Sequence, residues 1–305
     1  MEEKKVQLYP AKVRVVPNCK LAKVTANRTN EQYVDLLSGK KNGGILEKKK
    51  SKKHGDLIST YTITNADGYD GTDPLSFFDY SVLSVCDSTI AEGNDCITFA
   101  MILRGLTGKT TENGNGNLHA DQRDAIFNSV LKLMQTTIKI DLSDVNKELG
   151  YEGEKTIHRQ ILSAHIETTK INGQVVEDVV YFHKDDNGEV IKSPFFEVAD
   201  QRNQIIRYDT ELLDVPNQNN TPLVITIKNY VILRIMEIIK HKMTPTITLA
   251  DIFKKARITD KPNYLKQRAR EYVDEFLKHL QEKSVIKSFQ WTKKGNKFYG
   301  VSFTF

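Results

Sequence analysis

The stretch ITLADIFKKARI at residues 247–258 repeats a phrase found earlier in the chain, ITFAMILRGLTG at residues 97–108. Over the first eight positions, both stretches fit the template Ile-Thr-apolar-Ala-x-Ile-apolar-Lys/Arg. The apolar spacing after the Ile-Thr pair is that of a short helix. A match of this length can arise by chance, so the sequence around each copy decides whether the phrase was duplicated.

The surroundings of the two copies also match. Each copy follows an apolar helical pattern and precedes a loop, a longer helix and a strand-like run. The longer helices end in LKLMQ at 131–135 and LKHLQ at 277–281. The offset between the copies is 150 residues at the phrase and 146 at the helix ends, because the first copy has a longer Gly/Asn-rich loop. This shared order predicts an internal duplication.

The second copy belongs to a series of elements typical of a winged helix. An apolar helix at 226–243, the extended link TPTIT, the phrase helix and a third helix from Tyr264 to Glu282 precede two strand-like runs. These runs, VIKSFQWT and KFYGVSFTF, are joined by KKGN, whose Gly-Asn pair is a favoured hairpin turn. Together with the duplication, this order predicts an α+β fold with two winged-helix domains in tandem.

The predicted chain has three parts. A basic N-terminal arm and linker cover residues 1–73, with a short strand at KVRVV. The first winged-helix domain covers 74–216 and contains a hairpin insert, because Asn172-Gly173 suits the positive φ angles of a type I′ turn. The linker DVPNQNNTP then leads into the second winged-helix domain at 221–305.

Positive charge is concentrated at both ends of the chain. The 305 residues include 44 Lys/Arg and 39 Asp/Glu, a net charge of +5. Residues 1–60 hold 14 Lys/Arg against 6 Asp/Glu and residues 251–305 hold 13 against 6, so the middle of the chain is acidic. Basic stretches attract polyanions such as nucleic acid or anionic membranes.

Membrane insertion and secretion are not expected. The longest apolar stretch, YVILRIMEII at 230–239, is much shorter than the ~18 residues of a membrane span. The opening MEEKKVQLYP lacks the apolar region of a secretory signal. We therefore expect a cytoplasmic protein with no membrane partner.

No residue pattern predicts catalysis. GLTGKTT at 105–111 is not a phosphate-binding loop, because Leu103 stands where the first glycine is needed and a helix precedes the loop instead of a strand. The three cysteines form no CxxC pair, and His158 and His165 lack the spacing of metal ligands. We expect a protein that is not an enzyme and uses no cofactor and no metal.

The third helix of the second copy carries the side chains expected to read DNA. Asn263, Lys266, Gln267 and Arg270 follow the i, i+3, i+4, i+7 pattern of one helix face, which we place opposite the apolar stripe. Arg and Lys pair with guanine, and Asn and Gln with adenine. The preceding helix and the hairpin add cations that suit phosphate contacts: Lys254, Lys255, Arg257, Lys293, Lys294 and Lys297.

The first copy lacks this charge pattern. The offset of 146 aligns Gln267 with Asp121 and Arg270 with Asp124. Carboxylates at these positions repel phosphates. We therefore predict that the second winged helix binds DNA, whereas the first forms a dimer or partner surface.

The tandem arrangement, the charged third helix and the ending IKSFQW, KKGNKFYGVSF resemble the replication initiators of theta-replicating bacterial plasmids. The resemblance covers roughly residues 75–305 and also extends to uncharacterised proteins of Gram-positive conjugative elements. It implies binding to repeated origin sites, dimerisation through the first winged helix and recruitment of host replication proteins.

Two other classes of function fit the same sequence. One is a transcriptional regulator of a mobile element, and the other is an interaction or inhibitory module whose winged helices bind protein. Repeated sites beside an AT-rich region would favour an initiator, and sites overlapping a promoter would favour a regulator. A lack of salt-sensitive DNA binding would favour the protein-binding module.

Overall fold

The computed structural model describes residues 10–17, 45–50, 59–65, 75–109, 118–141, 156–201, 205–295 and 297–305. These residues form a mixed α+β structure with several helices and four small sheets.

The chain divides into two compact units that alternate along the sequence. The C-terminal unit comprises Met1–Arg14, Ala100–Ala125 and Ile206–Phe305, and the central unit comprises Val15–Phe99 and Ile126–Ile205. The predicted boundary at 216–221 falls within the C-terminal unit.

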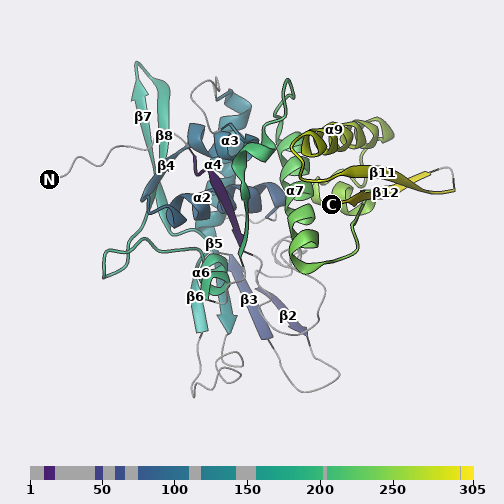
Figure 1. Cartoon of the computed structure of the whole chain (residues 1–305). Helices are drawn as coiled ribbons and strands as arrows, with labels where there is room; N and C mark the ends of the chain where they lie inside the picture. The colour runs from purple at the N-terminus through teal and green to yellow at the C-terminus, as the bar shows by residue number, and fades with distance from the viewer. Residues whose placement is uncertain are drawn as a thin grey trace. The chain divides into compact units, whose positions relative to one another are not determined.

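The second copy of the phrase lies in the C-terminal unit (Figure 1). The order of elements is the one predicted from the sequence, and the three strands form an antiparallel sheet in the order β10-β12-β11. The elements are α7 (Pro222–His241), β10 (Thr246–Thr248), α8 (Leu249–Lys255), α9 (Asn263–Glu282), β11 (Ser288–Lys294) and β12 (Lys297–Thr304).

The phrase itself explains the step from strand to helix. Thr248 ends β10 and caps α8, because its hydroxyl accepts a hydrogen bond from the backbone N–H of Asp251 at 3.1 Å. The same hydroxyl donates to the Asp251 carboxylate at 2.6 Å. Ile247 and Ile252, on either side of the cap, are each 1% exposed and lie in the core.

The first copy repeats this topology. Ile97 pairs with Val180 just as Ile247 pairs with Val301, and all four residues are at most 1% exposed. The turn between the hairpin strands has positive φ at Asn172-Gly173, as predicted. The strand order is β4-β8-β7. The elements are α2 (Phe77–Ala91), β4 (Cys96–Thr98), α3 (Phe99–Thr107), α4 (Ala120–Gln135), β7 (Ala164–Ile171) and β8 (Gln174–Phe182).

One equivalence predicted from the sequence is wrong. The strand after the long helix of the first copy, β5 (Thr136–Asp141), does not belong to the hairpin sheet. It pairs with β3 (Ser59–Asn65) and β6 (Thr156–Gln160), and β2 (Ile45–Lys50) lies at the other edge of that sheet. The β7–β8 hairpin is therefore the counterpart of β11–β12, and the inserted segment is β5–β6.

The described part of the N-terminal arm is built into the fold. KVRVV forms β1 (Val13–Pro17), as predicted, and β1 forms a two-stranded sheet with β9 (Ile205–Asp209). Residues 45–50 and 59–65 form β2 and β3. The rest of the predicted arm, including the last three residues of KKKSKK, lies outside the described residues. Between β8 and α7 lie α6 (Pro194–Gln201) and the short 3₁₀ helix Thr210–Leu213.

Arg14 caps the first copy's phrase helix from inside the C-terminal unit. Its side chain is 1% exposed and donates to the carbonyl of Gly105 and to the Asn229 side-chain oxygen, both at 3.0 Å. Asn229, on α7, donates in turn to the carbonyl of Leu106 at 3.0 Å. The last carbonyls of α3 thus obtain the partners that the helix cannot supply.

Gly108 stands directly after α3, within the stretch GLTGKTT. Gly105 and Thr107 belong to α3, and Gly108 ends the helix with φ of +88°. A Cβ at Gly108 would lie 2.2 Å from the backbone nitrogen of Asp214, so the chain packs closely at this point. No helix among the described residues is long and apolar enough to cross a membrane.

At Gly300, β12 lies very close to β10. A Cβ at this position would lie 2.5 Å from the carbonyl oxygen of Ile247, which is shorter than any tolerated contact. Gly300 pairs with Thr248 on one side and Thr292 on the other, so it sits in the middle strand of the sheet. A larger residue would push β12 away from β10.

We predict that Gly300→Ala lowers the free energy of unfolding by about 1–3 kcal/mol, because the added methyl group overpacks the strand pair. Urea unfolding of the full chain measures the change. Ser302→Ala in the same strand is the control, since it removes only an exposed hydroxyl that donates to Gln290. Equal stability of the two variants would contradict the predicted close contact.

Candidate nucleic-acid interface

The four candidate residues of α9 share one flank of the helix, but this flank is not opposite the buried stripe. Asn263 and Gln267 are exposed, whereas Lys266 and Arg270 are half-buried. The Gln267 side chain donates to Glu271 at 3.1 Å. The predicted placement opposite the core is therefore wrong for Lys266 and Arg270, which are partly buried, and the Phe298 ring of the hairpin lies against Arg270.

A single aromatic ring joins the helix to the hairpin. The guanidinium of Arg270 lies over the ring of Phe298, with its carbon 4.1 Å from the ring centroid. The ammonium of Lys293 lies 5.0 Å from the same centroid. Attraction between a cation and the face of an aromatic ring contributes about 0.5–1 kcal/mol at exposed sites. The structure thus brings together one predicted cation of α9 and one of the hairpin.

Trp291 and Asp274 strengthen this junction. The Trp291 ring meets Phe298 edge to face at 6.0 Å between centroids, and its indole N–H donates to Asp274 at 2.9 Å. Lys278 pairs with the same carboxylate at 2.8 Å. Partial burial would raise the pKa of Asp274, but the hydrogen bonds from Lys278 and Trp291 outweigh it and hold this pKa below its ordinary value. Trp291 therefore packs against the helix.

The cations at and just after the end of the phrase helix differ in exposure. Lys254 and Arg257 are exposed, and Arg257 has a φ of +55° just after α8. Lys255 is only 6% exposed, which does not suit a phosphate contact. Lys254 and Lys255 occupy the last turn of α8, where positive charge is favourable to the helix dipole.

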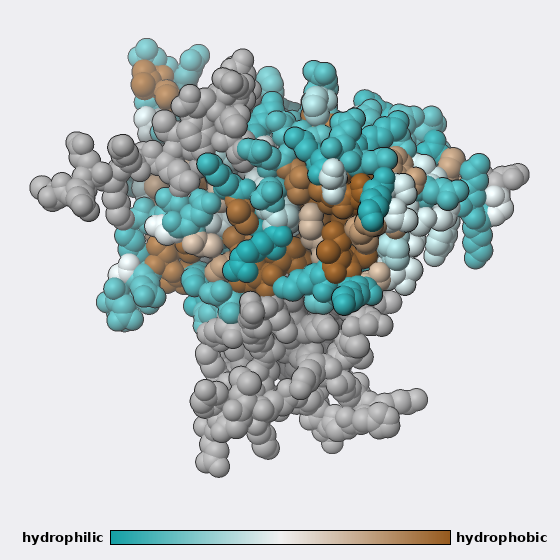
Figure 2. All heavy atoms as spheres, viewed as in Figure 1, coloured by the Kyte–Doolittle hydropathy of each residue, from teal (hydrophilic) through white to brown (hydrophobic). Residues whose placement is uncertain are grey.

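The two hairpins present opposite kinds of surface. Lys293, Lys294 and Lys297 are exposed on β11–β12. Lys294 and Lys297 are partners in the strand register, at the end of the hairpin. Figure 2 shows apolar atoms at the tip of the β7–β8 hairpin. The exposed apolar side chains there are Ile171, Val175 and Val176, at 57%, 38% and 59%. The hairpin of the second copy thus suits an anionic partner, and the hairpin of the first copy does not.

The long helix of the first copy presents acids where the second presents cations or amides. Asp121 and Asp124, at the start of α4, are both exposed. Arg123 lies 3.6 Å from Asp124 and balances part of this charge. Their exposure agrees with the sequence argument that this helix repels phosphates.

Sequence reasoning missed two residues of this surface. Phe298 was not a candidate, although its place next to Lys297 at the hairpin end of a strand gave a usable signal. Tyr264, next to Asn263 on the first turn of α9, is 62% exposed and adds an aromatic ring.

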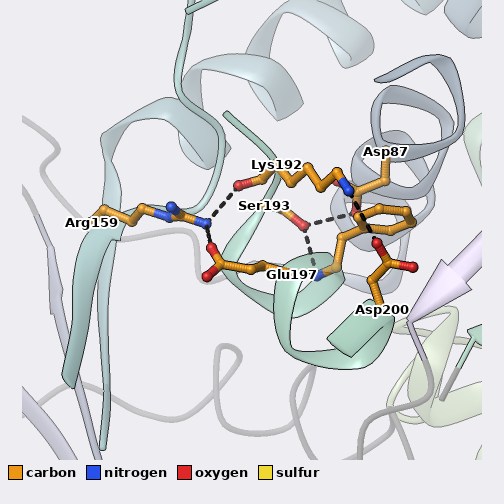
Figure 3. A network of polar contacts seen from close by, with 7 residues as sticks. Asp87, Arg159, Lys192, Ser193, Glu197 and Asp200 are labelled. Carbon is orange, nitrogen blue, oxygen red and sulfur yellow. Dashed lines mark hydrogen bonds and ion pairs between the residues drawn. The ribbon is translucent and has the colours of Figure 1, made fainter. Parts of the chain in front are cut away.

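A separate polar cluster lies in the central unit (Figure 3). Asp87 of α2 is fully buried and accepts a hydrogen bond from the Ser193 hydroxyl at 2.9 Å. Ser193 accepts from the backbone N–H of Phe196, so it caps α6. Around this pair, Arg159 bonds to Glu197 and to the carbonyl of Lys192, and Lys192 pairs with Asp200 at 3.0 Å.

Burial changes the ionisation of Asp87. Loss of solvation raises its pKa to about 7, although the hydrogen bonds from Ser193 and the charges of Arg159 and Lys192 act in the opposite direction. The folded-state pKa thus lies above the ordinary value of 3.8. Between these two values the folded protein holds a proton that the unfolded chain has released, so stability falls as the pH rises through this window.

We predict that Asp87→Asn removes this pH dependence. The wild-type free energy of unfolding should fall by a few kcal/mol, up to about 4, between pH 4 and pH 7 through this group. The amide stays neutral, so the variant should lose much less. Urea unfolding across this pH range measures the difference, with Asp200→Asn as the exposed control. An Asp87→Asn curve parallel to wild type would exclude the buried, protonated carboxyl.

Comparison with known proteins gives little further identification. No protein-family model matches the chain, and no curated protein matches it. A crystal structure of domains 2 and 3 of RctB aligns with 89% of this chain and 96% of its own, at 13% identity and a TM-score of 0.46. A second structure, of selenomethionine derivatives of the same RctB domains, aligns over the same shares at 12% identity and a TM-score of 0.39. These TM-scores are too low to establish a shared fold.

Proposed function

We propose that this protein binds double-stranded DNA through the α9 helix and the β11–β12 hairpin, as a replication initiator-like protein of a plasmid or mobile element. In this proposal residues 221–305 form a winged helix that recognises repeated origin sites. The winged-helix assignment is supported by the element order and by the strand order β10-β12-β11. The initiator role rests on the sequence resemblance described above.

The observation that carries the proposal is the Arg270–Phe298–Lys293 contact. It places a cation of the helix and a cation of the hairpin against one ring, at 4.1 and 5.0 Å from its centroid. Scattered surface cations are usually only solvated, whereas cations from two elements that share a contact form one continuous positive surface. Such a surface attracts the phosphates on both sides of a groove.

The proposed role of the first copy is contact with protein. The exposed apolar tip of β7–β8 and the exposed acids of α4 favour a protein partner over DNA. A homodimer through this copy and recruitment of host replication proteins belong to the same proposal. The proposed activity is binding without catalysis.

Selection of bound fragments from the DNA of the element that encodes the protein tests the proposal. Repeated sites beside an AT-rich region would support an initiator. Sites overlapping a promoter would replace that role with transcriptional regulation, and an absence of salt-sensitive binding would reject DNA as the partner.

We predict that changing Lys293, Lys294 and Lys297 together to Ala weakens the salt dependence of binding. If about six candidate cations meet phosphates, log K falls with log salt at a slope of about −5, and the loss of three contacts flattens it by roughly 3. Fluorescence anisotropy with a labelled duplex of random sequence, at several salt concentrations, measures the slope.

The matched control changes Lys170, Lys283 and Lys287 to Ala, which removes the same charge from exposed positions outside this surface. Its slope should stay near that of wild type. If the two triple variants behave alike, general charge and not the hairpin determines binding.

A further inference from the structure

Phe298 holds two positive charges together. Arg270 comes from the second turn of α9 and Lys293 from β11, and both lie against the same ring. The register of the hairpin makes this arrangement, because a bulge between Thr292 and Lys293 sets Lys293 directly opposite Phe298. Figure 1 shows the hairpin running alongside α9 within the C-terminal unit.

Asp274, an acid that interacts with Arg270, already has two other partners. Asp274 contacts Lys278 at 2.8 Å and the indole of Trp291 at 2.9 Å, and it also attracts Arg270 electrostatically. Both cations lie within 5.0 Å of one ring centroid, so their separation is comparable to the screening length of about 8 Å at physiological salt and their charges repel each other. A bound anion would relieve that repulsion.

We propose, on the basis of the DNA-binding function above, that Arg270 and Lys293 together bind one phosphate of the DNA backbone and that Phe298 positions both cations for it. Arg270 then fixes the register of the protein on the duplex. The sequence pattern predicts instead that this residue reads a guanine. A half-buried guanidinium whose carbon lies over a ring can still offer N–H groups to a phosphate. Its stacking keeps it from reaching freely into a groove.

Base reading is left to the first turns of α9 in this arrangement. Asn263 and Lys266 lie nearer the start of the helix, where recognition helices contact base edges. Gln267 would have to leave its hydrogen bond with Glu271 to read a base. The sequence preference of the protein therefore depends on Asn263 and Lys266, and its general affinity on Arg270 and Lys293.

The test uses the full chain and a pool of duplexes of randomised sequence. Arg270→Ala should weaken binding to all members of the pool alike and flatten the log–log salt slope by about 0.9, as loss of one phosphate contact does. Arg270→Lys keeps the charge and should retain most of the affinity. Phe298→Leu should weaken binding about two- to fivefold, the effect of losing a surface cation–ring contact, and Phe298→Tyr should not.

Trp291 reports whether each variant keeps the junction intact. It is the only tryptophan in the sequence, and it touches both Phe298 and Asp274, so its emission follows this site alone. A Phe298→Leu variant with altered emission in the absence of DNA has lost its local structure. In that case Arg270→Ala and Phe298→Tyr decide the question.

Two results would overturn the inference. One is an Arg270→Ala variant with an unchanged salt slope and a changed preference at one base position, because Arg270 would then be a base reader. The other is a correctly folded Phe298→Leu variant that binds like wild type, because the ring would then position nothing. Failure of the wild-type protein to bind any duplex in a salt-sensitive way is a different result, which rejects the proposed function and this inference with it.

Discussion

The close approach of β12 to β10 at Gly300 is the constraint on which the second copy depends. Only a residue without a Cβ fits there, because a methyl group would lie 2.5 Å from the carbonyl of Ile247. β10 leads directly into α8, so β12, which pairs with β10, must return beside the helices. β11 pairs with β12 and therefore lies there too. The contact of Phe298 with Arg270 follows from that return, and with it the meeting of helix and hairpin cations.

The first copy satisfies the same topology with different side chains. Val179 stands opposite Thr98, where the second copy has Gly300 opposite Thr248, so the first sheet carries a side chain at the position of Gly300. Along the chain, β5 and β6 precede the β7–β8 hairpin, and they belong to another sheet. The two copies thus share a framework but differ in surface chemistry. The buried positions, Ile97 and Ile247 above all, are shared, and the exposed ones differ.

Apolar spacing was sufficient to predict the elements but not their partners. The helices, the Asn172-Gly173 hairpin and the strand at KVRVV follow from local patterns, and all are present. The sheet to which β5 belongs depends on its pairing with β3, which lies far earlier in the sequence, and no local pattern records that pairing. Similarly, helical spacing grouped Asn263, Lys266, Gln267 and Arg270 correctly, but the side of α9 that the hairpin covers depends on the bulge at Thr292 and Lys293.

Some cations in this chain therefore have a structural role, because they stabilise the end of a helix. The phrase helix of the first copy ends in carbonyls that receive hydrogen bonds from Arg14 and Asn229. The phrase helix of the second copy carries Lys254 and Lys255 in its last turn, and positive charge there stabilises a helix whether or not DNA is present. The contrast between FKKAR at 253–257 and LRGLT at 103–107 thus reflects, in part, two ways of ending a helix. This explanation does not apply to Arg270 on α9 or to Lys293 on the hairpin, because neither residue lies at a helix terminus. Their positive charge needs another explanation.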